Sequence, residues 1–364
     1  MTYIYENPGY PRFTWNKDEI VNHLTQVSVL QGKILGKMQQ FGFGIQHEAM
    51  LNALTEEITK SNEIEGEILN SEQVRSSLAK WLNIHLENET HPSHYIEGIV
   101  EAMVDAVQNY NIPLTENRLF SWHHVLFPSG RSGLHKIRVA QYRDSNMQVV
   151  SHKGYREVVH YEAPDAQKVQ EQMSDFLHWL NAEDNENPLL KAAIAHLWFV
   201  IIHPFDDGNG RLTRVITEML LTRSENTHLR FYSMSSQIQK DKKAYYQILE
   251  STTTGSLDIT RWLVWFLECL VRAIQASDTL LDGVLQKAAF WQKNSMVSIN
   301  EQQQQILNLL LNGFAGNLTS GKVAQMLKVS QDTAIRLLND LVRKQLLEVQ
   351  GAGRGTHYLI TPNK

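Results

Sequence analysis

Residues 203–214, with the sequence HPFDDGNGRLTR, bring together the residue types that phosphate chemistry requires. Gly208 and Gly210 precede an apolar pattern of helical period over 212–222, so they lie at the N-terminus of a helix. Unpaired backbone N–H groups and the positive end of the helix dipole make such a terminus an anion site. Because glycine has no Cβ, its backbone can approach a phosphate closely. The segment therefore predicts a phosphate-binding loop.

The side chains around these glycines supply the other groups that such a site needs. Asn209 adds a side-chain donor at the same place, and Asp207 is a hard oxygen ligand placed to hold Mg²⁺ between phosphates. Arg211 and Arg214 are three positions apart, so they share one face of the first helical turn and can hold two phosphoryl groups. His203 can take a proton from an attacking hydroxyl as a neutral imidazole. The alternative is a glycine turn between two helices with a solvated arginine pair, which the combination disfavours.

The surrounding sequence predicts a mainly α protein. The chain has 364 residues, 42% of them hydrophobic and 20% charged, which suits a globular protein of two or three domains. From Gln46 to about Trp291 apolar residues recur with helical period, with interruptions at 129–163 and 203–210. The first interruption indicates a loop with a short β-hairpin. An apolar helix over 189–202 leads into the phosphate loop.

Residues 1–44 form a distinct N-terminal segment. Pro8 and Pro11 exclude a helix through its aromatic start. A helical pattern follows from Lys17 to about Met38 and ends at the glycines that come next.

The last residues, 298–364, predict a separate domain of three helices and a hairpin. The expected helices and strands are 304–312, 318–330, 331–344, 346–350 and 356–360. This order resembles a winged helix-turn-helix. Residues 319–364 carry seven Lys and Arg against three Asp and Glu, a balance of +4, and Arg336 is the one strong base reader in the candidate recognition helix. DNA binding and a role in dimerisation or target docking both stay open.

Bulk properties limit the class of protein. A net charge of −5 argues against a chain that coats nucleic acid. Cys269 is the single cysteine, so no internal disulfide forms, and its apolar neighbours predict a buried thiol. The N-terminus lacks a basic segment followed by an apolar run, and the apolar stretches are shorter than the roughly 20 residues that span a bilayer. We therefore expect a cytoplasmic protein without a membrane segment.

Residues 203–214 match the motif of the Fic family, His-x-Phe-x-Asp/Glu-Gly-Asn-Gly-Arg-x-x-Arg, at every specified position. The chain resembles the adenylyltransferases of this family, which move AMP from ATP to a protein hydroxyl. It does not resemble the related kinases, in which the Gly-Asn-Gly-Arg core is altered. The resemblance implies that His203 is the base, that Asp207 binds Mg²⁺, that residues 208–210 cradle the phosphates and that the two arginines bind the β and γ groups.

The family also has a β-hairpin flap beside the site, which docks the target segment as an added strand. The resemblance implies that residues 147–151 and 158–161 form this flap and a wall of the nucleotide site. The ATP-binding residues expected there are Val159, His160 and Tyr161. Tyr245 and Tyr246 resemble the family's aromatic pair near the adenine, with packing in a helical core as the alternative.

Residues 61–66, SNEIEG, fit the inhibitory motif Ser/Thr-x-x-x-Glu-Gly/Asn of autoregulated Fic proteins. Ser61 and Glu65 are four positions apart and share a helix face, and Gly66 follows where the helix can end. The resemblance implies that a helix around 46–68 brings Glu65 to Arg214 at the ATP site. We expect a Fic catalytic domain at 45–292, with a helical core and a hairpin flap.

The expected function is transfer of AMP from ATP, with Mg²⁺, to a Tyr, Thr or Ser hydroxyl of a target protein that the sequence does not name. Self-modification and a homodimer are also expected. Two alternatives stay open. The same site could remove AMP by hydrolysis, with Glu65 activating water, or the chain could be a DNA-binding regulator whose pocket senses nucleotide.

Overall fold

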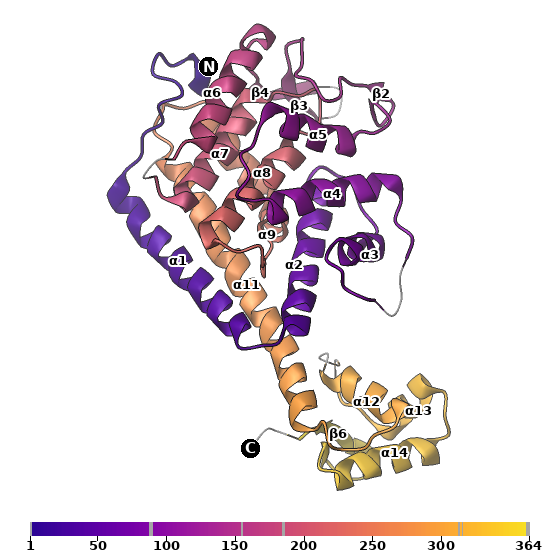
Figure 1. The fold of residues 1–364 in the computed structure, drawn as a ribbon. Helices are drawn as coiled ribbons and strands as arrows, with labels where there is room; N and C mark the ends of the chain where they lie inside the picture. The colour runs from indigo at the N-terminus through magenta and orange to yellow at the C-terminus, as the bar shows by residue number, and fades with distance from the viewer. Residues whose placement is uncertain are drawn as a thin grey trace. The chain divides into compact units, whose positions relative to one another are not determined.

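The computed structural model describes residues 2–86, 90–153, 156–183, 186–311, 314 and 316–361. Two compact units make up the chain, residues 1–278 and 279–364, and each is described by itself (Figure 1). The division falls inside helix α11 (Thr260–Lys293), ahead of position 298, where the sequence analysis begins the C-terminal domain. Helices dominate both units, so the mainly α fold class is confirmed.

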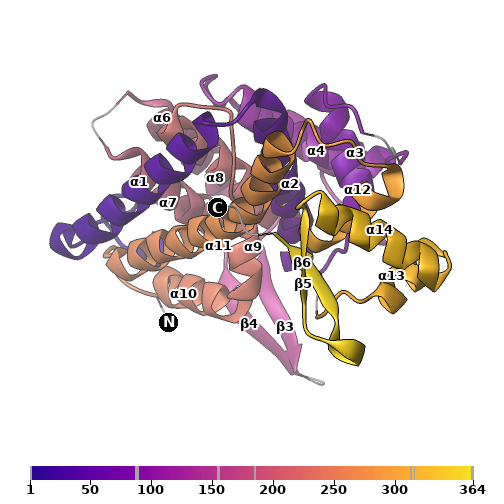
Figure 2. The ribbon, with the colours of Figure 1, turned by 90° about the horizontal axis from the view of Figure 1, so that it is seen from below.

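The helices of the first unit are α1 (Lys17–Gln39), α2 (Phe43–Ile64), α3 (Ser71–Trp81), α4 (His94–Gln108), α5 (Glu116–Leu126), α6 (Val169–Asn181), α7 (Pro188–Ile202), α8 (Asn209–Glu225), α9 (Met234–Lys240), α10 (Lys242–Thr253) and the first part of α11. Two antiparallel hairpins join them, β1 (Arg131–Ser132) with β2 (His135–Lys136) and β3 (Gln148–Lys153) with β4 (Arg156–Glu162). The second hairpin is the predicted one. It extends away from the helices, with α10 beside β4 (Figure 2).

The core of this unit is built on α7 and α8, which lie side by side (Figure 1). Asn187 begins α7 by accepting a hydrogen bond from the Leu189 N–H, and Pro188 occupies the first helical position, where it needs no donor. Because α7 is apolar on almost every side, nearly all of its residues are buried. Residues 203–208 connect these two helices, so the predicted phosphate loop is fixed at both ends by the core.

Two further helices border this core. Lys33 and Lys37 of α1 pair with Asp278 of α11 at 2.9 and 2.6 Å. Helix α2 packs against α9, where the buried Glu57 accepts hydrogen bonds from the Ser233 hydroxyl and the Ser235 N–H. This carboxylate therefore caps the N-terminus of α9 and joins it to α2.

The second unit has its own apolar core. Its elements after α11 are α12 (Glu301–Leu311), α13 (Ser320–Leu327), α14 (Gln331–Arg343), β5 (Leu347–Gln350) and β6 (His357–Ile360). Leu307, Leu318, Leu338 and Leu341 are fully buried in it, and β5 pairs antiparallel with β6. Three helices and a hairpin follow one another in the order that the sequence predicts. That the unit is a winged helix-turn-helix remains an interpretation of this order.

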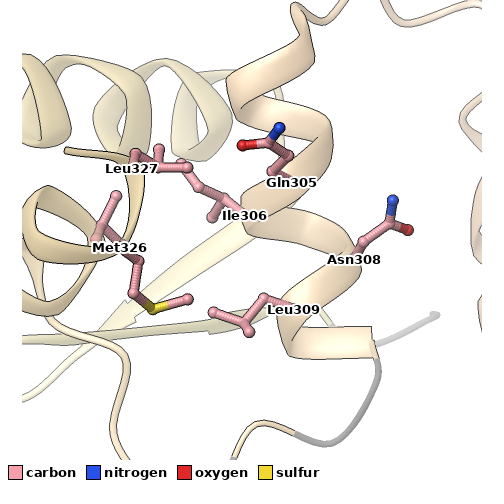
Figure 3. Close-up of a pocket in the computed structure, with 7 residues that line it drawn as sticks. Gln305, Ile306, Asn308, Leu309, Met326 and Leu327 are labelled. Carbon is pink, nitrogen blue, oxygen red and sulfur yellow. The ribbon is translucent and has the colours of Figure 1, made fainter. Parts of the chain in front are cut away.

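An apolar groove of about 360 Å³ lies in the second unit. Its lining residues are Gln305, Ile306, Asn308, Leu309, Val323, Met326 and Leu327. The side chains of Met326 and Leu327 point toward α12 (Figure 3). No charged or titratable side chain lines this groove.

None of the helices in the described part of the chain combines the length and the hydropathy that crossing a bilayer requires. Cys269 is fully buried, as predicted, and burial raises the pKa of its thiol well above the usual range. The thiol is therefore protonated and unreactive at neutral pH.

Candidate nucleotide-binding site

The loop between α7 and α8 is closed by the side chain of Asn209. Its Oδ1 accepts from the Phe205 N–H at 2.9 Å, and its Nδ2 donates to the Phe205 carbonyl at 2.7 Å. Phe205 is fully buried and stacks on the His123 ring, with 4.1 Å between centroids. The sequence analysis assigned Asn209 as a donor to phosphate. In the structure its amide fixes the backbone of the loop through one of its two N–H donors, and donation to phosphate stays a prediction.

The two glycines of the loop differ in how strongly their surroundings restrict them, because a Cβ on Gly208 would meet a buried ring and one on Gly210 would meet the end of a flexible side chain. Gly208 has φ +81°, and a Cβ there would lie 2.7 Å from the Phe127 ring. A Cβ on Gly210 would collide with the carboxylate of Glu65. The N-terminal turn of α8 therefore has glycine on its open side, as an anion site at a helix terminus requires.

His203 ends α7 in the left-handed region, with φ +50°. Burial lowers the pKa of its imidazole to about 4, although the carboxylates of Glu65 and Asp207 act in the opposite direction. A backbone hydrogen bond with Val200 also acts against the effect of burial. His203 is therefore neutral at physiological pH, the state that a general base needs.

Arg143 holds the end of α7 in place. Its Nε donates to the His203 carbonyl at 2.8 Å, its Nη1 to Ser145 O at 2.8 Å and its Nη2 to Pro164 O at 2.5 Å. A helix leaves its last carbonyls without partners, and this buried guanidinium satisfies one of them at the residue that carries the imidazole. Arg143 thereby fixes the backbone of His203.

His123 of α5 supports the loop from behind. Its Nδ1 accepts from the Ala140 N–H at 3.0 Å, so Nε2 carries the proton and donates to the Asp207 carbonyl at 3.2 Å. Burial lowers the pKa of His123 to about 4, so this neutral tautomer persists at physiological pH. His123 therefore positions the backbone that leads into Gly208.

Asp207 has a carboxylate that is 42% exposed. The Ser132 hydroxyl donates to its Oδ2, and its Oδ1 accepts from the Gly208 N–H at 2.5 Å. The described residues contain no cluster of three or more His, Cys, Asp or Glu that could hold a metal by itself. Mg²⁺ is commonly bound by one or two carboxylates together with substrate phosphates, so a single accessible Asp207 fits that ion.

Arg214 is buried and bonded to α2. Its Nε donates to Ser61 Oγ at 2.8 Å, and its Nη2 donates to Ser61 O and to Glu65 Oε1, both at 2.8 Å. Helix α2 ends just before Glu65, and Gly66 follows with φ +89°. The structure thus brings together Ser61, Glu65, Gly66 and Arg214 as the sequence analysis expects.

Arg211 is bonded to two residues that the sequence analysis did not single out. Its Nη1 donates to Tyr95 OH at 2.9 Å and to Glu67 Oε2 at 3.2 Å. Its guanidinium carbon lies 4.8 Å from the centre of the Phe127 ring. Both arginines of the motif therefore lie near carboxylates of the turn after α2.

The hairpin residues differ in what they can contact. Val159 is 44% exposed, and His160 lies with its Nδ1 3.4 Å from Glu250 Oε2. Tyr161, in contrast, is buried, donates to the Ile201 carbonyl at 2.6 Å and packs edge-on against Tyr3. The assignment of Tyr161 to the ATP site is therefore corrected. Side chains alternate along a strand, and this one faces the core.

The two tyrosines of α10 also point in different directions. Tyr245 is buried, with its hydroxyl 2.9 Å from His196 Nε2, whereas Tyr246 is 41% exposed. The two rings nevertheless lie close together, with 5.3 Å between their centroids. Because the Tyr245 hydroxyl also contacts Arg214, its assignment as an adenine contact stays a prediction, with packing in the helical core as the alternative. Tyr246 keeps the assignment as a prediction, and burial raises its pKa to about 12.

Comparison with known families places these features in context. Residues 113–221 match the Fic/DOC family, and this range includes His203, the glycine loop and both arginines. The chain contains a Fic domain. Residues 3–84, which include α1, α2 and the residues that contact Arg214, match a domain of unknown function, DUF4172.

Two relatives that share this region are named protein adenylyltransferases. The chain is 30% identical over 144 residues to a protein adenylyltransferase Fic of Nematostella vectensis, which covers 39% of this chain and 30% of that protein. It is 45% identical over 58 residues to protein adenylyltransferase fic-1 of Caenorhabditis elegans, which covers 15% of this chain and 11% of that protein. The chain thus spans less than a third of either relative.

The fold is shared with a solved structure. A Fic family protein from Desulfovibrio desulfuricans G20 matches with a TM-score of 0.58 and 22% identity, over 97% of this chain and 99% of that chain. At this identity the likeness shows a common fold.

Four residues around the Fic loop were missed by the sequence analysis: Glu67, Tyr95, His123 and Arg143. None lies within the 203–214 segment, and each reaches it only through the tertiary fold. Of the four, only Glu67 could have been suspected from the sequence, because it directly follows the expected inhibitory motif at 61–66.

Proposed function

We propose that this protein transfers AMP from ATP to a Tyr, Thr or Ser hydroxyl of a protein, itself included, and that Glu65 inhibits the reaction. One observation carries the proposal. A half-buried His203, whose pKa is lowered, lies beside a helix N-terminus whose arginine, Arg214, is occupied by a carboxylate. A carboxylate in that position is a stand-in for a phosphate, because both offer paired anionic oxygens to a guanidinium.

Each residue of the site has its own role in the proposed transfer of AMP. The N–H groups of 208–210 and the guanidinium groups of Arg211 and Arg214 bind the phosphates of ATP. Asp207 would hold Mg²⁺, which would neutralise part of the phosphate charge. His203 takes the proton from the target hydroxyl as its oxygen bonds to the α-phosphorus, and the bond to the departing pyrophosphate breaks.

Inhibition follows from competition for Arg214. A carboxylate and a guanidinium about 4 Å apart attract by about 4 kcal/mol at an effective dielectric of 20, before desolvation. The γ-phosphate must displace this tethered ligand. With Glu65 in place the γ end is turned away and the α-phosphate is misaligned, and a displacement near 1 Å costs about 10²-fold in rate.

The exposed side of the β3–β4 hairpin is the proposed docking edge for the target. Val150 and Val159, which pair with each other across the hairpin, are 37% and 44% exposed on it. An extended segment of the target can add to this hairpin as a further strand.

The test is labelled-phosphate transfer by Glu65→Gly with Mg²⁺. Label should appear on protein from α-labelled ATP and not from γ-labelled ATP. Label from γ-labelled ATP would instead indicate a kinase. Absence of both, with ATP still bound, would indicate a nucleotide sensor.

Removal of AMP in the same site is the second candidate function. The Glu65 side chain is 32% exposed, and within the described residues its Oε2 accepts no hydrogen bond, so this oxygen is available to activate water. Under this alternative wild type releases AMP from a modified protein, and Glu65→Gly does not.

A further inference from the structure

The two arginines of the loop present different edges to the nucleotide site. A guanidinium binds two oxygens of one phosphate through its side edge, formed by Nε and Nη2. On Arg214 this edge is occupied, because Nε donates to Ser61 Oγ and Nη2 donates to Ser61 O and Glu65 Oε1.

Arg211 has the reverse arrangement. Its Nη1 is used twice, toward Tyr95 OH at 2.9 Å and Glu67 Oε2 at 3.2 Å. Its buried Nε has no hydrogen-bond partner within the described residues, and its Nη2 lies 3.8 Å from Asp207 Oδ1, too far for a hydrogen bond. The side edge of Arg211 is therefore open.

An open edge on a buried guanidinium needs an explanation. Arg211 is 4% exposed, and a buried donor without a partner costs about 1–3 kcal/mol, more when it is charged. An anion that enters the site and accepts from Nε and Nη2 removes this cost. The neighbouring loop of glycines is built for such an anion.

Tyr95 and Glu67 determine which edge stays open. The Tyr95 hydroxyl donates to Glu67 Oε2 and accepts from Arg211 Nη1, so the three groups form a closed set of hydrogen bonds. Burial raises the pKa of Tyr95 well above its usual range, which keeps the hydroxyl protonated. The ring of Phe127 covers one face of the guanidinium and limits its rotation.

We propose that Glu67 and Tyr95 are positioning residues, which hold Arg211 with its side edge directed at the β- and γ-phosphates of ATP before the nucleotide binds. This inference rests on the proposed function for the identity of the ligand. The turn from Glu65 to Glu67 then has two opposite effects on phosphate binding. Glu65 blocks Arg214, whereas Glu67 orients Arg211 toward the phosphates. Inhibition is accordingly relieved by movement of the Glu65 side chain, because displacement of the whole turn would release Arg211.

The experiment measures binding of ATP and of AMP by titration calorimetry, with the full chain in the Glu65→Gly background. Tyr95→Phe and Glu67→Gln are added singly. Tyr95→Phe removes the hydroxyl that accepts from Arg211, and Glu67→Gln keeps an acceptor oxygen but removes the charge that strengthens its bond to Arg211. We expect each to weaken ATP binding about tenfold, the usual worth of a hydrogen bond to a charged group. AMP lacks the β- and γ-phosphates, so its affinity should change less than twofold. KM for ATP should rise in parallel.

Glu72→Gln is the matched control, because it makes the same charge change at an exposed position of α3. It should leave both affinities as they are. Unchanged ATP affinity in Tyr95→Phe and Glu67→Gln would overturn the proposal, and so would an equal loss for ATP and AMP, which indicates a general structural role. The difference between the changes in ATP and AMP affinity can be measured even if Glu65→Gly transfers no AMP. Failure of this inference is therefore distinct from failure of the proposed function.

Discussion

Glu65 Oε1 lies 2.8 Å from Arg214 Nη2, although the two residues are 149 positions apart in the chain. The carboxylate also fills the space beside Gly210 that a Cβ would need. A single side chain at the end of α2 thus contacts both the arginine and the glycine turn of α8. Under the proposed function, Glu65 and a nucleotide phosphate compete for this position.

Glu65→Gly should therefore raise AMP incorporation at least tenfold over wild type. The change frees Arg214 and leaves its Ser61 contacts in place. The measurement is α-labelled AMP incorporation at equal protein concentration with Mg²⁺. Arg214→Ala should not reproduce the gain, because it removes the phosphate contact together with the inhibitor's partner. Equal incorporation by wild type and Glu65→Gly would contradict the inhibitory role.

Ser61→Ala should activate less than Glu65→Gly. It removes the hydrogen bond from Arg214 Nε and keeps those from Nη2 to Ser61 O and Glu65. A lost bond to a charged group is worth about 1.5–3 kcal/mol, but Nε also becomes available to phosphate. An activity between wild type and Glu65→Gly is expected in the same assay. If Ser61→Ala exceeded Glu65→Gly, Ser61 rather than Glu65 would be the main inhibitory contact.

His203→Ala should abolish AMP transfer and keep ATP binding nearly unchanged. The imidazole lies at the end of α7, outside the turn that binds phosphate, and loss of a general base typically costs 10²–10⁴-fold. Incorporation in the Glu65→Gly background and ATP affinity by calorimetry check this. Near-normal transfer by the double variant would show that another group accepts the proton.

The free energy of unfolding should fall as the pH drops from 6.5 to about 4.5. Burial lowers the pKa of His123, His196 and His203 to about 4, 3 and 4. Below the ordinary pKa of 6.5 the unfolded chain therefore binds three protons that the folded chain does not. Burial also raises the pKa of Glu218 to about 7, so the folded chain holds one extra proton in this range.

The net difference is about two protons in favour of the unfolded state, which corresponds to at most about 3 kcal/mol per pH unit. Urea unfolding at pH 7.5, 6.0 and 5.0 measures it. If the free energy of unfolding stayed constant or rose as the pH was lowered from 7.5 to 5.0, the three imidazoles would not be held neutral in the folded protein.

Duplex DNA should bind the full chain no more tightly than about 10⁻⁶ M at moderate salt, the range of non-specific binding. On α14, Arg343 and Lys344 pair with Asp340, and Arg336 bonds to Thr333. We therefore expect the C-terminal unit to contact protein, a second copy or a target, rather than DNA. Fluorescence anisotropy with a labelled duplex tests this, and binding near 10⁻⁸ M that Arg336→Ala weakens would favour a DNA reader.

The sequence by itself determined the elements and the loop. Apolar spacing predicted α1 and α14 to within a residue, because an amphipathic helix must repeat its apolar positions every three or four residues. The segment 203–214 combined glycines, arginines and a histidine so closely that local geometry alone places them at one helix terminus. Residues 61–66 likewise predicted a helix end at Gly66, which needs a left-handed conformation.

Tertiary structure alone decided which side chains face the site. Tyr245 and Tyr246 are neighbours of one type, yet the packing of α10 buries one and exposes the other. Asn209 and Tyr161 have polar groups suited to a ligand, but nearby backbone atoms take up the Tyr161 hydroxyl and part of the Asn209 amide, because a buried polar group must find a partner. Tyr95 reaches Arg211 across 116 positions, and no local pattern can encode a contact that exists only once separate helices pack together.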